Sequence, residues 1–156
     1  MHRDFKLANV FIHQGQAIIG DFGFAKAGEG MTATRLGTPY NMAPELLLEK
    51  KKPYSSKADI WAIGIAFYQM LFGKRPFGEG MSQDKILSDQ TMLRATRVEF
   101  PEKSTISQGA KDFITSCLTY DQDLRPDVIT ICNHSYLYPQ NSKRKSGNSN
   151  TLIQMD

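Results

Sequence analysis

The sequence predicts a mainly α-helical domain with one small β-hairpin near its amino end. Two short apolar runs at residues 10–12 and 17–19 flank a turn that contains Gly15, which is typical of a hairpin. After residue 56 the apolar residues recur at helical spacing, most clearly over residues 107–120. A chain of 156 residues, 40% of them apolar and 22% charged, is long enough to bury one such core.

Composition and charge exclude several classes of protein. The 19 basic and 16 acidic residues leave a net charge of +3, which is too balanced to predict a nucleic-acid partner. The longest apolar run, residues 60–72, is too short to span a membrane, and no apolar run follows Met1, so no signal peptide is expected. Cys117 and Cys132 form no CxxC pair, which favours two reduced thiols in a cytoplasmic protein over a disulfide.

The middle of the chain alternates between irregular and helical segments. Residues 20–41 are rich in Gly, Thr and charge, which predicts a long functional loop. A short helix is expected over residues 42–49. Ser56 is a candidate N-cap for a helix through residue 71 that is apolar nearly all round and therefore buried, and Gly73 is placed to end that helix.

The remaining chain predicts further helices and then a tail. Amphipathic pieces lie within residues 82–98, a helix with one apolar face covers residues 107–120, and a last short helix covers residues 127–137. The polar, low-complexity residues that follow cannot bury enough apolar area to offset ordering entropy. We therefore expect one domain over residues 1–139 and a disordered polar tail over residues 140–156.

The chemistry lies in three motifs within the first 45 residues. In chain order they are His2-Arg3-Asp4-Phe5-Lys6-Leu7-Ala8-Asn9, Asp21-Phe22-Gly23 and Met42-Ala43-Pro44-Glu45. Asn9 follows Asp4 by five residues, Asp21 follows Asp4 by seventeen, and Glu45 follows Asp21 by twenty-four. Each motif alone is commonplace, but together and in this order they match the catalytic loop, metal-binding triplet and activation-segment end of protein kinases.

Phosphoryl transfer explains why these residue types are needed. A carboxylate must orient the substrate hydroxyl and accept its proton, which is the role predicted for Asp4. Mg²⁺ prefers oxygen ligands, which Asn9 and Asp21 would supply, while Lys6 would reach the transferred phosphate. Gly23 would provide the backbone freedom that the turn after Asp21 needs.

Each of these residues, taken by itself, can also be explained by an ordinary structural role. Asp4 is then a surface aspartate, Asn9 a turn residue, and Asp21 a helix cap or turn former. The ordered set of three motifs excludes this interpretation. A calcium loop is excluded as well, because the alternating Asp/Asn pattern around a central Gly is missing.

From residue 2 to about residue 137, the chain resembles the large lobe of a serine/threonine protein kinase, with the amino-terminal lobe absent. Further matches are residues 58–64, Pro76-Phe77 and Leu124-Arg125-Pro126. The resemblance implies ATP and Mg²⁺ as cofactors and a protein substrate. It also implies that Phe11 joins the nucleotide-binding residues Lys6, Asn9 and Asp21. By the same resemblance, Asp59 anchors the catalytic loop, and Arg125 forms a partly buried bidentate ion pair with Glu45.

The resemblance narrows the substrate class. Lys6 and the run Gly37-Thr38-Pro39 are similar to the serine/threonine branch, in which Thr38 would hydrogen-bond between Asp4 and Lys6. Residues 21–26 and 40–45 resemble the Unc-51-like, autophagy-initiating kinases. Phe5 stands where leucine is usual in the family, at a position that carries no chemistry.

Structural and regulatory roles follow from the same resemblance for His2, Arg3, Phe22 and Gly23. Thr34 stands where the family's activating phosphothreonine falls, with Thr32 as the alternative, and would pair with Arg3 once an activating kinase has phosphorylated it. An unmodified polar loop residue is the competing interpretation.

The sequence contains no Gly-rich phosphate loop, strand lysine or partner glutamate, all of which the kinase template requires. We expect this chain alone to bind ATP poorly, and the helix around Trp61 to expose apolar surface. The chain is then either part of an active kinase or a non-catalytic remnant that acts as a protein-binding module. The full set Asp4, Lys6, Asn9 and Asp21 favours the enzyme, and an unrelated helical scaffold is a third alternative.

Overall fold

The computed structural model describes residues 1–27, 37–48 and 55–138. The expected tail, Thr32 and Thr34 lie outside these residues. The described part is mostly helical with a single two-stranded antiparallel sheet. None of the described helices has the length and hydropathy that a membrane span requires.

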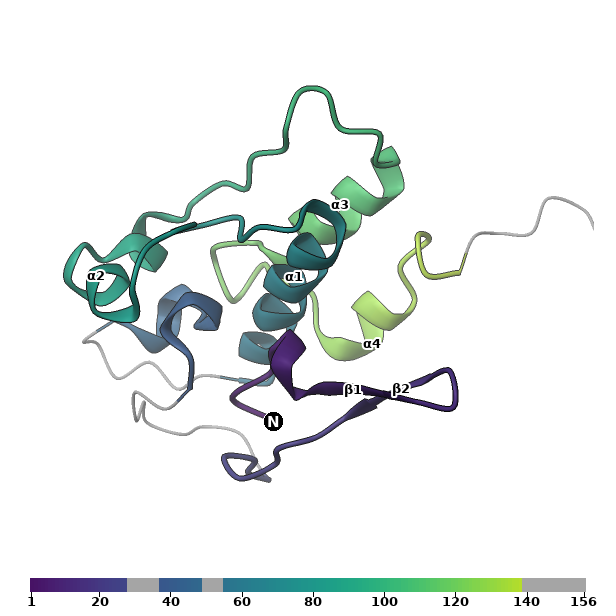
Figure 1. The fold of residues 1–156 in the computed structure, drawn as a ribbon, viewed down its shortest axis with the longest axis horizontal. Coiled ribbons are helices and arrows are strands. Elements are labelled where there is room, and N and C mark those ends of the chain that lie inside the picture. Colours follow the sequence, from purple (N-terminus) through teal and green to yellow (C-terminus); the bar gives the residue numbers. More distant parts are fainter. Residues whose placement is uncertain (28–36, 49–54, 139–156) are drawn as a thin grey trace, which may run out of the picture.

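Helix α1 (Lys57–Phe72) forms the centre of the fold, with α2 (Gln83–Ser88) on one side and α3 (Gln108–Cys117) and α4 (Val128–Cys132) on the other (Figure 1). Half of its sixteen residues are buried, among them Trp61, which has no exposed surface. The expectation of bare apolar surface around Trp61 is therefore wrong. Of the large apolar side chains of α1, Met70 is the one that is largely exposed.

Close contact between α1 and α3 depends on Gly64. A β-carbon at this position would lie 2.7 Å from Cys117 Cβ and 2.9 Å from the Leu118 side chain. The missing side chain lets the two helices approach and bury an aromatic and aliphatic core on both sides of α1. Gly73 ends α1 in the left-handed conformation, as the sequence predicts.

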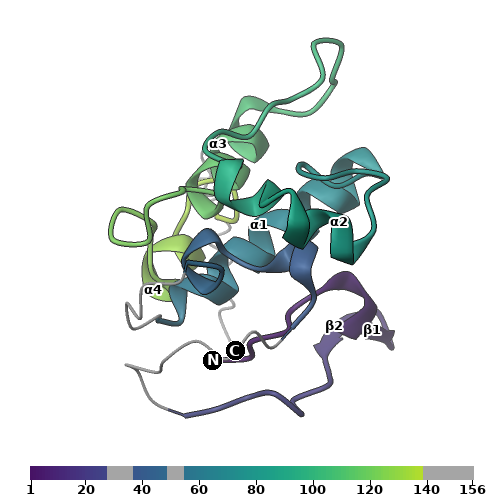
Figure 2. The same cartoon turned by 90° about the vertical axis from the view of Figure 1, so that its left-hand side faces the viewer.

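The amino-terminal segment lies beside this helical body, and its hairpin projects from one edge in both views (Figures 1 and 2). A short 3₁₀ turn, Leu7–Asn9, leads into β1 (Val10–His13), which pairs with β2 (Gln16–Ile19). The connecting residues Gln14 and Gly15 both have positive φ, which is typical of the tight hairpin turn. The hairpin is therefore confirmed.

Several helix boundaries differ from those expected. Residues 42–48 form only the 3₁₀ turn Pro44–Leu46, because Pro44 disfavours the helical conformation at Ala43, which is extended, and Glu45 is held by a distant partner. The helix expected over residues 127–137 ends at Cys132 and continues as turns. Ser56 occupies the N-cap position of α1, but its side chain makes no capping hydrogen bond, and the Ser55 hydroxyl accepts the Lys57 amide instead.

Candidate active site

The predicted catalytic loop, residues 2–6, has no regular secondary structure, so side chains from other segments satisfy its backbone. Asp59, in the first turn of α1, accepts the amide of His2 at 2.8 Å and that of Arg3 at 2.9 Å, one with each carboxylate oxygen. The prediction that Asp59 anchors this loop is confirmed. Arg3 has a φ of 70°, an uncommon conformation that these bonds help to hold.

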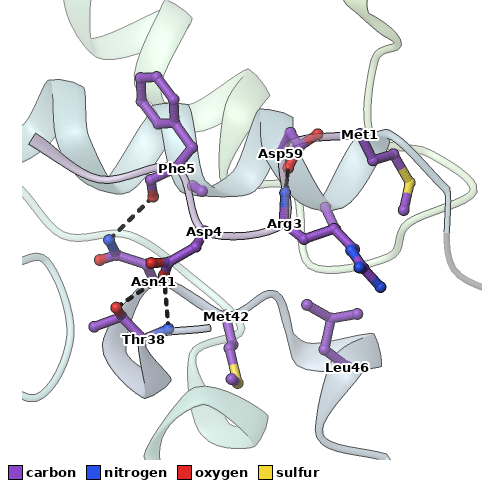
Figure 3. Close-up of a pocket in the computed structure, with 11 residues that line it drawn as sticks. Met1, Arg3, Asp4, Phe5, Thr38, Asn41, Met42, Leu46 and Asp59 are labelled. Atoms are coloured by element: carbon purple, nitrogen blue, oxygen red, sulfur yellow. Dashed lines mark hydrogen bonds between the residues drawn. The ribbon is translucent and has the colours of Figure 1, made fainter. Parts of the chain in front are cut away.

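Two buried side-chain amides hold the next two carbonyl groups. Asn9 Nδ2 donates to the Asp4 carbonyl at 3.0 Å. Asn41 Nδ2 donates to the Phe5 carbonyl at 3.2 Å (Figure 3). The peptide planes on either side of Phe5 are thus both fixed from outside the loop. The sequence analysis did not identify Asn41, for which the only signal was its place between Thr38 and Glu45.

The Asp4 carboxylate is buried and held at both oxygens. Thr38 donates to Oδ1 from its amide at 3.0 Å and from its hydroxyl at 2.9 Å, while Lys6 Nζ donates to Oδ2 at 2.7 Å. Lys6 Nζ also donates to Thr38 Oγ1 at 3.1 Å. The predicted position of Thr38 between Asp4 and Lys6 is confirmed, and it joins two segments more than thirty residues apart.

Burial of the Asp4 carboxyl raises its pKa, but the Lys6 and Thr38 hydrogen bonds and the Lys6 charge outweigh burial and lower the pKa below its usual value. Asp4 is therefore ionised at neutral pH. An ionised carboxylate with fixed orientation can accept a hydrogen bond from a substrate hydroxyl, and then its proton.

The close approach of Gly37 and Thr38 to the catalytic loop depends on the glycine at position 37. This residue has a φ of 115°, and a β-carbon on it would lie 2.8 Å from the Arg3 carbonyl oxygen. Any other residue at this position would therefore have a strained backbone and would force a shift where this segment contacts Arg3.

The hairpin brings Asp21 back to Asn9. Gly20 donates its amide to the Asn9 carbonyl at 2.8 Å, so Asp21 follows directly after the residue paired with Asn9. Asp21 is exposed and has a φ of 58°, whereas Gly23 has no positive φ. The expectation that Gly23 provides the unusual backbone conformation is therefore wrong, because Asp21 itself adopts it.

Asn9 and the exposed Asp21 are the side chains of this region that could contribute oxygen ligands to a metal ion. No group of three or more His, Cys, Asp or Glu side chains with metal-binding geometry occurs among the described residues. Mg²⁺ usually takes one or two carboxylates and keeps waters and phosphate oxygens as its other ligands, which fits an exposed Asp21 next to Asn9.

The remaining predicted residues of this region lie around the same loop. His2 contacts the Phe22 ring at 4.9 Å between centroids, and its Nε2 lies 3.0 Å from the Gly20 carbonyl oxygen. Arg3 Nε donates to the Phe24 carbonyl. Phe11 lies on β1 with 56% of its surface exposed.

The ion pair between Arg125 and Glu45 is confirmed, and it is fully rather than partly buried. Its two hydrogen bonds measure 2.7 and 3.0 Å, and the Arg125 side chain has no exposed surface. The other guanidinium donors bond the carbonyl oxygens of Lys57, Thr119 and Tyr120. All five donors of Arg125 are thus used, which ties Glu45 to the start of α1 and to the residues that follow α3.

A small pocket lies directly beneath the catalytic loop (Figure 3). Its walls come from the loop itself, from residues 38–46 and from α1, and they include Asp4, Thr38, Asn41, Met42 and Asp59. The side chains that hold the loop therefore also line the space under it.

Comparison with known proteins identifies the family. Residues 1–137 match the protein kinase domain. The chain belongs to the protein kinase family. Over 88% of its length it is 44% identical to the serine/threonine-protein kinase TOUSLED of Arabidopsis thaliana, and over 97% it is 37% identical to the human serine/threonine-protein kinase tousled-like 1. The chain spans 22% of the length of each of these relatives.

The subfamily expectation needs correction. A tousled-like 1 kinase of Caenorhabditis elegans is also 34% identical over 98% of this chain. These relatives are tousled-type kinases, so the assignment to the Unc-51-like kinases is wrong. It relied on residues 21–26 and 40–45, where several positions are loop residues without a required chemical role.

Proposed function

We propose that the chain is the large, carboxyl-terminal lobe of a serine/threonine protein kinase domain, formed by residues 1–139. Its parent protein would transfer the terminal phosphoryl group of ATP to serine or threonine of protein substrates. The family match over residues 1–137 and the relatives named as serine/threonine-protein kinases support this proposal. The observation that carries it is the ionised Asp4 carboxylate, held at both oxygens by Thr38 and Lys6.

Asp4 is the proposed catalytic base. Because the Thr38 amide and hydroxyl use both lone pairs of Oδ1 and Lys6 uses one of Oδ2, the remaining acceptor site is on Oδ2 and has a narrow range of directions. A substrate hydroxyl held there would be oriented for attack and would lose its proton to Asp4. Lys6, 28% exposed at its side chain, would also approach the transferred phosphoryl group as a cation.

Asn9 and Asp21 are the proposed Mg²⁺ ligands, and Phe11 the proposed contact to the nucleotide. The bond from Asn9 Nδ2 to the Asp4 carbonyl supports the metal assignment, because it fixes the planar amide and therefore the direction of Oδ1. Bound Mg²⁺ would neutralise charge on the phosphates. Phe11 lies on β1 and Asp21 lies two residues beyond the end of β2, and both side chains are exposed, which supports a shared nucleotide site.

Arg3 and Thr34 are the proposed regulatory pair. A phosphate on Thr34, added by an activating kinase, would compete with the Phe24 carbonyl for the Arg3 guanidinium. We also infer a cytoplasmic, reducing setting for the protein. Two free cysteines support it, and burial raises the pKa of the Cys117 thiol to about 12, which makes that thiol unreactive.

The test is phosphoryl transfer by the full-length protein as its gene encodes it, with Mg²⁺, labelled ATP and a generic protein substrate. Wild type should label serine and threonine. The substitution Asp4→Asn removes the proton acceptor at nearly constant size and should lower kcat by about 10²–10⁴-fold. Label on tyrosine alone, or an Asp4→Asn protein as active as wild type, would refute the proposal.

A further inference from the structure

Asn41 ends the 3₁₀ turn Pro39–Asn41, which follows Thr38 directly. Its amide closes this turn by donating to the Thr38 carbonyl at 2.8 Å. The side chain is 6% exposed and lies under the catalytic loop (Figure 3). Asn41 therefore lies where the segment that contains Thr38 contacts the catalytic loop that contains Asp4.

The Asn41 side chain donates a hydrogen bond to one atom of that loop, the Phe5 carbonyl oxygen. The Phe5 carbonyl that it holds belongs to the peptide bond between Phe5 and Lys6. A peptide group is planar, so fixing this carbonyl fixes the plane from which Lys6 departs. Lys6 in turn bonds both Asp4 and Thr38. A rotation of the Phe5 carbonyl would consequently shift the Lys6 ammonium away from Asp4.

Among the described residues, one of the two polar atoms of the Asn41 side chain, Nδ2, has a hydrogen-bond partner. Within the described part of the chain, Asn41 Oδ1 is buried and has no hydrogen-bond partner. A buried acceptor without a partner lowers stability, whereas an apolar side chain of similar size would have no such acceptor. The donor on Nδ2 is thus the feature of Asn41 that the surroundings use.

We propose that Asn41 is a positioning residue that sets Lys6 against Asp4 by holding the Phe5 carbonyl. This inference rests on the proposed kinase activity. Asn41 itself touches neither substrate nor nucleotide in this scheme, and acts through the peptide between Phe5 and Lys6. Its loss should lower the rate of transfer without weakening the binding of the protein substrate.

The first variant for the test is Asn41→Leu in the full-length protein, which keeps the size and removes both polar atoms. The matched control is Asn133→Leu. Asn133 Nδ2 also donates to a backbone carbonyl, that of Ile129 at 2.9 Å, at the end of α4. We expect kcat of Asn41→Leu to fall about 10- to 100-fold, as small displacements of reacting groups do. The KM of Asn41→Leu for the protein substrate should not change. The kcat of Asn133→Leu should not change either.

The second variant, Asn41→Asp, keeps the shape and makes the donor dependent on pH. An ionised carboxylate cannot donate to the Phe5 carbonyl, whereas a protonated one can. The ratio of its kcat to that of wild type should therefore rise as the pH is lowered from about 8 to about 6, since burial next to Asp4 raises the pKa of a new carboxyl.

The outcomes separate this inference from the proposed function. If wild type is active and kcat of Asn41→Leu lies within about twofold of the wild-type value, the positioning role alone is overturned. The same follows if the ratio of kcat of Asn41→Asp to that of wild type does not change across this pH range. A fall in kcat that only matches the loss of folded protein, measured by thermal unfolding, overturns it as well. An inactive wild type overturns the proposed function, and the inference with it.

Discussion

Residues 1–27 and residues 55–138 place polar and apolar side chains in opposite ways. In residues 1–27 the two buried side chains are the polar Asp4 and Asn9, while Ile12 is 75% and Phe22 60% exposed. In residues 55–138 the buried side chains are mainly apolar, with Trp61 and others around α1 at the centre. Residues 55–138, the helical part, are thus held together by burial of apolar side chains. Residues 1–27, the catalytic segment, are attached to the helical part by directional hydrogen bonds.

The difference shows that one kind of interaction stabilises the fold of this domain and another fixes the positions of the atoms at its site. Burial of apolar surface is strong but non-directional, so it stabilises a helix packing without fixing single atoms closely. Hydrogen bonds to charged groups are directional and shorter, so they fix atoms at a site. Asp59 and Thr38 contribute such bonds to the catalytic loop from two separate segments.

The largest effect on stability should come from the buried ion pair between Arg125 of the helical part and Glu45. Arg125→Ala leaves Glu45 buried without its partner, and we expect it to lower the free energy of unfolding by about 3–5 kcal/mol. The measurement is urea unfolding of the full-length protein. Arg94→Ala, which removes an exposed arginine, is the matched control and should have almost no effect. Equal effects of the two variants would contradict the role given to the ion pair.

The same substitution in the two regions sharpens the comparison directly. Ile65 in α1 has no exposed surface, whereas Ile12 in β1 is 75% exposed. Ile65→Ala should cost about 2–5 kcal/mol of unfolding free energy through lost burial and the cavity left behind. Ile12→Ala should change it by less than about 0.5 kcal/mol. Similar costs at both positions would mean that the hairpin packs against apolar surface in the full-length protein.

A smaller effect concerns the pH dependence of stability in the catalytic segment. Because the folded-state pKa of Asp4 lies below its ordinary value of 3.8, folding favours the ionised form. This contribution is fully present above the unfolded pKa and is lost as the pH falls through the folded pKa. The stability of wild type relative to Asp4→Asn should therefore be constant from about pH 8 to about pH 5 and decline below about pH 4. A decline that begins near neutral pH would show that the Asp4 pKa is raised instead.

Local signals in the sequence predicted the elements that depend on local structure. The hairpin and α1, with Gly73 at its end, follow from apolar spacing and turn residues and match the structure. The pairing of Arg125 with Glu45, eighty residues apart, followed only from the family resemblance, because no local pattern couples them.

Other features could not be predicted because distant contacts decide them. The apolar run around Leu47 suggests a helix, yet Glu45 is held by Arg125 and the segment forms only a short turn. The roles of Asn41 and of the Asp21 backbone depend on which carbonyl or loop lies opposite, and no spacing in the sequence carries that information.

The substitution Asp59→Asn in the full-length protein tests most directly whether hydrogen bonds hold the catalytic segment in place on the helical part. The new amide group would face the His2 or Arg3 amide with a donor instead of an acceptor. We predict that kcat falls at least about tenfold, because the loop loses its anchor on α1, while the midpoint of thermal unfolding falls by only about 2–8 °C. Unchanged kcat, or a loss of activity explained entirely by unfolding, would contradict the account.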